Sequence, residues 1–168
     1  MKKNRIKKIV FLGLCTAVAM ILSYVEALLP PLWAAVPGIK MGLPNIMILF
    51  MLYRFSLKEA AAVSLVRLLL VALLFGNAMS LIYSLCGAAL SLFIMALLKK
   101  TDRFSEVGVS IAGGVFHNLG QVLAAMVLLE TAEIGYYMIA LAISGTIAGI
   151  LVGLAASFVL KYMKRVKI

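Results

Sequence analysis

Six apolar runs separated by short polar breaks make up most of the chain. They cover residues 9–29, 41–53, 57–75, 78–98, 107–129 and 137–160. Transmembrane strands would require alternating polar and apolar positions, which these runs lack. Helices satisfy the backbone in lipid, and about 20 helical residues cross the ~30 Å hydrocarbon core. The pattern therefore predicts an all-α, polytopic membrane protein with six transmembrane helices, the second of them short.

The two ends of the chain are basic. Residues 1–8 and 161–168 are expected to form cytoplasmic N- and C-termini on either side of a transmembrane domain at 9–160. A cleaved signal peptide is the alternative for the first run. That run is longer than the usual apolar region of a signal peptide, and a cleavage site at Trp33-Ala34-Ala35 would place Trp33 at the −3 position. We therefore expect a retained helix.

Composition supports a membrane protein and excludes a water-soluble enzyme or a disordered chain. Hydrophobic residues are 65% and charged residues 13% of the 168 residues. Soluble domains average about 45–50% and about 25%, respectively. The mean hydropathy of +1.14 agrees with this assignment.

The positions of the basic residues, which give the chain its net charge of +10, indicate the topology. All but two of the 16 Lys and Arg residues fall on one side of a six-span arrangement, namely at the two ends and in the connections 54–58 and 99–103. The positive-inside rule makes that side cytoplasmic. We expect a multi-pass protein of the cell membrane whose basic segments face anionic lipid rather than nucleic acid.

One of the two remaining cations, Arg67, lies within the third run. It is about ten residues from the cytoplasmic edge, or ~15 Å at the helical rise. His117, Asn118 and Gln121 lie at a similar depth in the fifth run, with Gln121 three and four residues from the other two. Because polar groups are costly at this depth, we expect a pocket for an anionic or strongly hydrogen-bonding ligand group. The alternative is that Arg67 pairs with helix carbonyls and the amides bridge helices.

Other polar residues are weaker candidates for the outer half of this pocket. Asn45 and Tyr83 complete the predicted substrate-binding set, and Glu26, Asn77 and Ser84 are further candidates. The connection 30–40 contains three prolines and a tryptophan. It is either an interfacial loop or a lid over the pocket.

Small residues spaced four apart predict close helix contacts. The sixth run has Gly145, Gly149 and Gly153 at this spacing, and the first run has two such pairs. These pairs are Gly13 with Ala17, and Ala19 with Ser23. Each stripe serves either packing within the chain or docking of a partner helix.

Motifs for catalysis are missing. There is no phosphate-binding loop of the GxxxxGK[ST] type, and Asp102 is the single aspartate, which excludes paired-aspartate Mg²⁺ chemistry. One His and the isolated Cys15 and Cys86 do not make a metal site. We expect no enzymatic activity, no cofactor and no metal.

Several stretches resemble a known family. They are residues 37–46, 58–67, 74–76, 83–88 and 108–121, the last ending in His-Asn-x-x-Gln. The chain resembles the Gx transporter family, also labelled heptaprenyl diphosphate synthase component I, and more broadly the substrate-binding S components of energy-coupling factor (ECF) transporters.

The resemblance implies a membrane subunit that captures a small-molecule substrate from outside. A membrane T component and two ATPases would couple transport to energy. S components typically meet the T component through Ala-x-x-x-Ala on the first helix, where this chain has the Gly13 and Ala19 pairs instead. The second label implies prenyl elongation, for which the chain lacks aspartate-rich motifs. A non-catalytic helper of heptaprenyl diphosphate or menaquinone synthesis, or a membrane assembly protein, remains the alternative.

Overall fold

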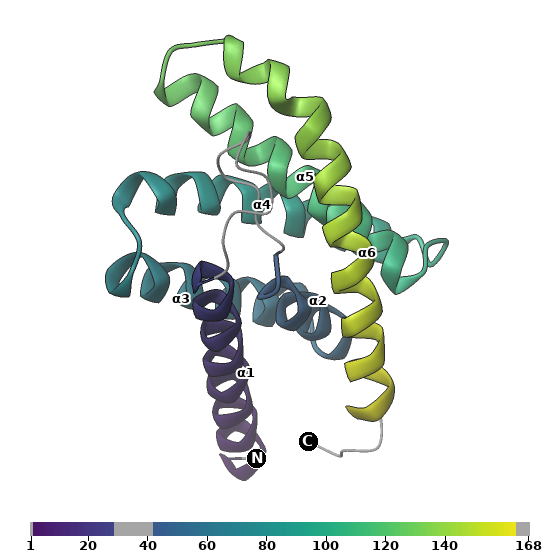
Figure 1. The fold of residues 1–168 in the computed structure, drawn as a ribbon. Helices are drawn as coiled ribbons and strands as arrows, with labels where there is room; N and C mark the ends of the chain where they lie inside the picture. The colour runs from purple at the N-terminus through teal and green to yellow at the C-terminus, as the bar shows by residue number, and fades with distance from the viewer. Residues whose placement is uncertain (1, 29–41, 164–168) are drawn as a thin grey trace.

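The computed structural model describes residues 2–28 and 42–163 and contains six α-helices within them (Figure 1). A short 3₁₀ helix, η1, precedes the last of these, and no strand occurs among the described residues. The elements are α1 (Lys2–Leu28), α2 (Asn45–Arg54), α3 (Leu57–Leu74), α4 (Ala78–Lys100), α5 (Glu106–Leu128), η1 (Glu133–Tyr137) and α6 (Met138–Met163). The predicted all-α class is confirmed.

The expected count of six transmembrane spans is not confirmed. By length and composition, four helical segments are long and apolar enough to cross a membrane: Arg5–Leu28, Ala78–Lys100, Glu106–Leu128 and Glu133–Met163. Helix α2 has only 10 residues and is therefore ~15 Å long, about half the hydrocarbon thickness. Helix α3 has 18 residues, but they include Lys58, Glu59 and Arg67.

Helix α2 forms the centre of the hydrophobic core. Its five consecutive residues from Ile48 to Leu52 are at most 2% exposed, because the helix is apolar all round and other helices surround it. Cys15, Val63, Leu92, Val109, Ala156 and Leu160 from the surrounding five helices belong to the same cluster. At the C-terminal end of α2, Lys99 of α4 donates a hydrogen bond to the Leu52 carbonyl at 2.6 Å. This bond satisfies one of the carbonyls that a helix end leaves without a partner.

Glycines bring α4, α5 and α6 into backbone contact. A Cβ added to Gly114 of α5 would lie 2.3 Å from the carbonyl oxygen of Gly145 of α6. Added at Gly149, it would lie 2.6 Å from the Cα of Ile111, and at Gly120 it would lie 2.9 Å from the Cα of Gly87 on α4. The small-residue stripe of the sixth run therefore packs within the chain, against α5.

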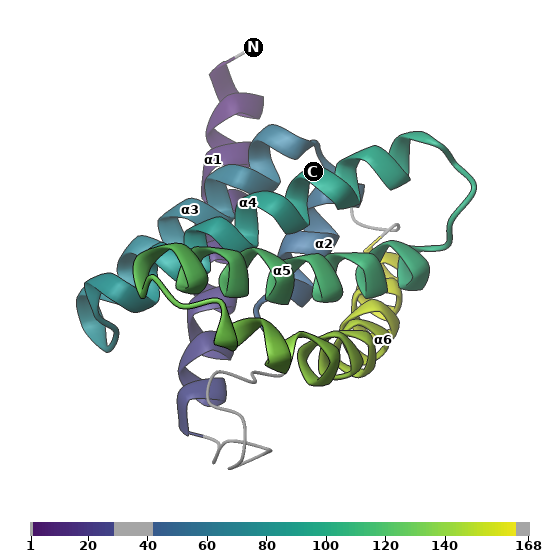
Figure 2. The same cartoon turned by 90° about the horizontal axis from the view of Figure 1, so that it is seen from above.

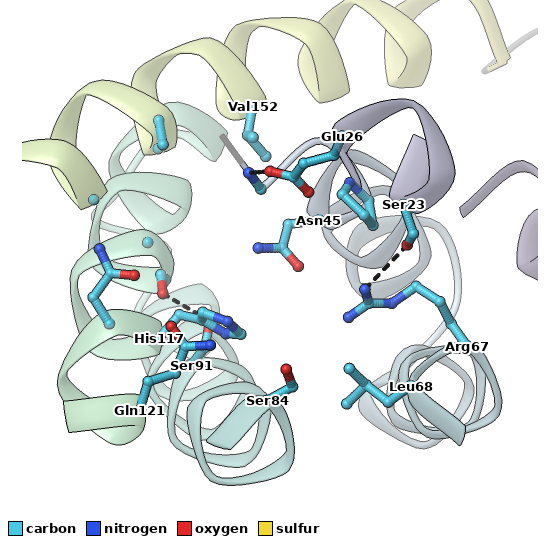
Figure 3. A pocket seen from close by; sticks show the side chains of 18 of the residues that line it. Ser23, Glu26, Asn45, Arg67, Leu68, Ser84, Ser91, His117, Gln121 and Val152 are labelled. Carbon is cyan, nitrogen blue, oxygen red and sulfur yellow. Dashed lines mark hydrogen bonds between the residues drawn. The ribbon is translucent and has the colours of Figure 1, made fainter. Parts of the chain in front are cut away.

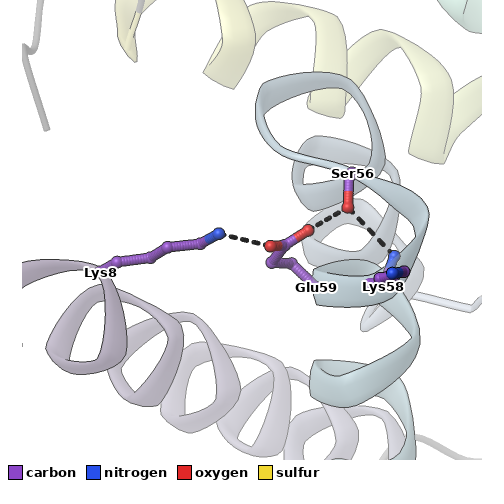
Figure 4. A network of polar contacts seen from close by, with 4 residues as sticks. All are labelled: Lys8, Ser56, Lys58 and Glu59. Atoms are coloured by element: carbon purple, nitrogen blue, oxygen red, sulfur yellow. Dashed lines mark hydrogen bonds and ion pairs between the residues drawn. The ribbon is translucent and has the colours of Figure 1, made fainter. Parts of the chain in front are cut away.

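The cytoplasmic ends of α1 and α3, in the predicted orientation, are joined by a polar network (Figure 4). Lys8 of α1 forms an ion pair with Glu59 of α3, and the Ser56 hydroxyl donates to the same carboxylate. The Ser56 oxygen also accepts from the Lys58 backbone N–H at 3.2 Å, so it caps α3. The Lys8 side chain is 43% exposed, so the ion pair is expected to contribute little to the free energy of unfolding.

The predicted docking residues of α1 divide into two groups. Ala19 and Ser23 are buried against the other helices, so in this structure they are not available to a partner. Gly13 and Ala17 are exposed, and no atom lies within 4 Å of a Cβ built on Gly13. The reason is geometric, since positions two residues apart point to different faces of a helix.

Seen from above, the axes of α3, α4 and α5 are roughly parallel, and α1 crosses them (Figure 2). The predicted lid at 30–40 and the last basic residues, Lys164, Arg165 and Lys167, lie outside the described residues.

The backbone contact at Gly114 generates a stability prediction. Gly114→Ala places a methyl group against the Gly145 carbonyl and is expected to destabilise the protein by about 1–3 kcal/mol. Thermal unfolding in detergent measures this loss. Gly13→Ala is the matched control, because its methyl group enters open space, and it is expected to be neutral or slightly stabilising. Equal melting temperatures for the two variants would contradict the proposed role of this contact.

Candidate functional site

A cavity of ≈ 180 Å³ lies among all six α-helices (Figure 3). It is located above the N-terminal end of α2, where Pro44, Asn45 and Leu49 form part of its wall. Residues of the other five helices complete the wall. Glu26 of α1 and Phe75 and Gly76 after α3 line the same cavity, so it extends towards the predicted outer side.

Arg67 of α3 supplies the positive charge of the site. The residue is only 8% exposed, and Figure 3 shows its guanidinium group directed into the cavity. Nη1 donates a hydrogen bond to the Ser23 hydroxyl of α1 at 3.3 Å. Nε is buried without a hydrogen-bond partner in the described part of the chain, and Arg67 makes no contact ion pair there. A buried guanidinium with so few partners is suited to binding an anionic group.

Helix α5 forms the opposite wall. His117, Asn118 and Gln121 all line the cavity, so the structure brings together the four polar residues predicted at one depth. The Asn118 Nδ2 donates to the Leu141 carbonyl of α6 at 2.7 Å, which matches the bridging alternative for this residue. The Gln121 side chain makes no hydrogen bond to any described residue, so its amide is available to a ligand.

Serines line the wall formed by α4. Ser80, Ser84 and Ser91 border the cavity, and the Ser91 hydroxyl donates to the Gly113 carbonyl of α5 at 2.8 Å. Ser80 and Ser91 were not predicted as site residues. They are four and seven residues from Ser84, so all three serines lie on one helix face. This spacing could have identified Ser80 and Ser91 from the sequence.

Glu26, one of the weaker candidates for the outer half of the pocket, places a carboxylate on the cavity. It accepts a hydrogen bond from the Gly42 backbone N–H and interacts electrostatically with Arg67. Position along the chain assigned Glu26 to the outer end of its helix. Packing of α1 against α3 then directs both charges towards the same space.

Of the two remaining predicted site residues, one lines the cavity and one does not. Asn45 lines it, in the first turn of α2, whose positive dipole end therefore points to the cavity. Tyr83 is not among the lining residues. Asn77, a weaker candidate, instead caps α4 by accepting from the Ser80 N–H at 2.8 Å.

The site combines one guanidinium, one carboxylate, one imidazole, amides and hydroxyls. Within the described residues, no group of three or more His, Cys, Asp or Glu side chains is arranged to hold a metal ion. The arrangement supplies fixed charge and hydrogen-bonding groups, which is suited to binding and orienting a small polar molecule.

Comparison with known proteins identifies the family. No curated protein and no solved structure matches the chain significantly. The family model described as heptaprenyl diphosphate synthase component I matches residues 15–159, which include all six helices in part or in full and every residue of the cavity wall. The chain therefore belongs to the heptaprenyl diphosphate synthase component I family.

Proposed function

We propose that this protein is a membrane-embedded binding subunit that captures a small molecule from the extracellular side, in the manner of an ECF S component. The observation that carries the proposal is the buried Arg67, directed into a cavity formed by all six helices. Burying a cation costs several kcal/mol unless a counter-charge compensates it. Glu26 and the Ser23 hydroxyl compensate part of this cost, and a ligand anion bound to the guanidinium would supply more compensation. A binding role for the cavity would therefore account for the buried cation.

The size of the cavity favours a small polar ligand over a prenyl chain. A cavity of ~150 Å³ holds benzene, so ≈ 180 Å³ encloses roughly seven non-hydrogen atoms. Seven isoprene units exceed this several-fold, and a hydrocarbon chain would leave the charged and amide groups of the wall without partners. We therefore infer that the cavity does not hold the product named in the family description.

The charge distribution supports a topology for the proposed subunit, and exposed small residues on α1 support a docking surface for its partner. We place both termini in the cytoplasm and count α2 and α3, with the four longer spans, as six membrane-embedded helices. The exposed Gly13 and Ala17 on α1 would meet a T component, which two ATPases would drive. The protein itself would bind and not catalyse.

The Arg67 variant tests ligand capture directly. Native mass spectrometry of the detergent-purified protein is expected to detect a retained small molecule in the wild type and none in Arg67→Gln. Removing one member of a buried charge pair costs about 2–5 kcal/mol of binding energy. Lys100→Gln, which removes an exposed cation at the cytoplasmic end of α4, is the control and should retain the ligand. Equal retention in the wild type and Arg67→Gln would refute the proposal.

Asn118 and Gln121 are expected to differ although both line the cavity. Gln121→Met should weaken ligand binding with little loss of stability, because the amide makes no hydrogen bond to a described residue. Asn118→Leu should lower the melting temperature, since it removes the 2.7 Å hydrogen bond to α6, worth about 1 kcal/mol. Melting curves with and without ligand separate the two effects. The reverse pattern would exchange the two roles.

The family description favours a second candidate function, that of a non-catalytic membrane helper of a prenyl diphosphate synthase. The two functions predict different partners. Capture and transport predict copurification of a T component and ATPases with the tagged protein from membranes. The helper function predicts that adding the purified subunit raises the output of a soluble prenyl synthase. An Arg67→Gln subunit that stimulates the synthase as well as the wild type would separate that activity from the cavity.

A further inference from the structure

Two opposite charges share one small cavity. Arg67 enters from α3 and Glu26 from α1, and the two interact electrostatically (Figure 3). Among the described residues of the cavity wall, Arg67 is the only Lys or Arg and Glu26 the only Asp or Glu. The formal charges of these two residues therefore cancel, and a ligand meets one cationic and one anionic position.

The cationic position is suited to one carboxylate. The guanidinium has a buried Nε with no described hydrogen-bond partner, and its Nη1 bond to Ser23 is long, at 3.3 Å. A carboxylate can accept two parallel hydrogen bonds from such a planar group. The N-terminal dipole of α2, at Pro44 and Asn45, adds positive potential at the same cavity.

The anionic position disfavours further negative charge on the ligand. A second carboxylate placed near Glu26 would be repelled by it, because like charges a few Å apart interact unfavourably. The Glu26 carboxylate is held in place by the Gly42 N–H, which donates a hydrogen bond to it. A phosphate group carries about −1.5 to −2 and a diphosphate more, so a single arginine opposed by a glutamate does not match them.

Apart from these two residues, the described wall combines apolar side chains with hydroxyl, amide and imidazole groups. Gln121 offers a donor and an acceptor that no described residue uses, and Ser84 lies on the adjacent wall. The ligand end opposite the carboxylate is therefore expected to carry an uncharged hydrogen-bonding group. At ≈ 180 Å³, the enclosed part of the ligand has roughly seven non-hydrogen atoms.

From these observations we propose that the cavity selects a small monocarboxylate. Arg67 binds the carboxylate, Gln121 binds a neutral polar group at the other end, and Glu26 excludes compounds with a second negative charge. This inference rests on the proposed binding function and assigns the chemical class of its ligand.

The test uses a matched panel of compounds with the full-length protein in detergent. The panel contains aliphatic and aromatic monocarboxylates of about five to twelve non-hydrogen atoms. Each is paired with its primary amide and with the dicarboxylate of the same skeleton, and inorganic pyrophosphate is added as a polyanion. Thermal shift screens the panel, and isothermal titration calorimetry measures the affinity of each compound that binds.

We expect at least one monocarboxylate to bind the wild type on the order of a hundredfold more tightly than its amide and its dicarboxylate. Arg67→Gln should remove the preference over the amide. Glu26→Gln should raise the affinity for the dicarboxylate about tenfold or more. The control Glu133→Gln, which neutralises an acid outside the cavity, should leave every ratio unchanged.

Three results would overturn the inference: an amide that binds as tightly as its acid, a dicarboxylate or pyrophosphate that binds best, or a panel in which no monocarboxylate binds. The wild-type ratios decide the matter even if Glu26→Gln does not fold. Arg67-dependent binding of a neutral or polyanionic compound would overturn the ligand class and leave the binding function intact. Failure of every compound, together with no retained ligand in native mass spectrometry, would overturn both.

Discussion

The ten-residue length of α2 is the constraint on which the rest of the structure depends. The helix is about half as long as the hydrocarbon core is thick, and its residues 48–52 are buried in one cluster with residues of the five longer helices. The cavity borders its N-terminal end, at Pro44 and Asn45, and residues of the other five helices complete the wall. The same short element thus produces the most tightly buried part of the protein and the cavity next to it.

The polar groups of the cavity are placed by rigid contacts. Backbone contacts through glycines fix α4, α5 and α6 relative to one another, and hydrogen bonds from Ser91 and Asn118 cross between these helices. A wall held this closely can keep Gln121 in position for a ligand, which reduces the ordering cost of binding. Arg67 and Glu26 come from the other half of the bundle, α1–α3. The cavity therefore lies between α1–α3 and α4–α6, which also pack against each other through α2 with α6 and α3 with α4.

Membership of the heptaprenyl diphosphate synthase component I family and the chemistry of the cavity suggest different functions. Among the described residues, the cavity wall combines apolar side chains with hydroxyls and amides, and Arg67 and Glu26 are its only Lys, Arg, Asp or Glu. This arrangement is suited to recognition of a small molecule. The glycine stripe of α6 packs against α5 of the same chain. A partner helix would therefore find its small residues on α1, at Gly13 and Ala17.

The sequence by itself determined the helical membrane class, the helix order and the polar residues that share one depth. Hydrophobic runs and helical spacing are local properties of the chain, so Arg67, His117, Asn118 and Gln121 could be grouped before any packing was known. Only the tertiary structure decided which of their atoms are available. It showed that Asn118 bridges to α6, that Tyr83 lies off the cavity and that Ser23 faces Arg67. It also brought Glu26 to the cavity. These outcomes depend on how helices rotate and cross when they pack, and the period of a single helix does not contain that information.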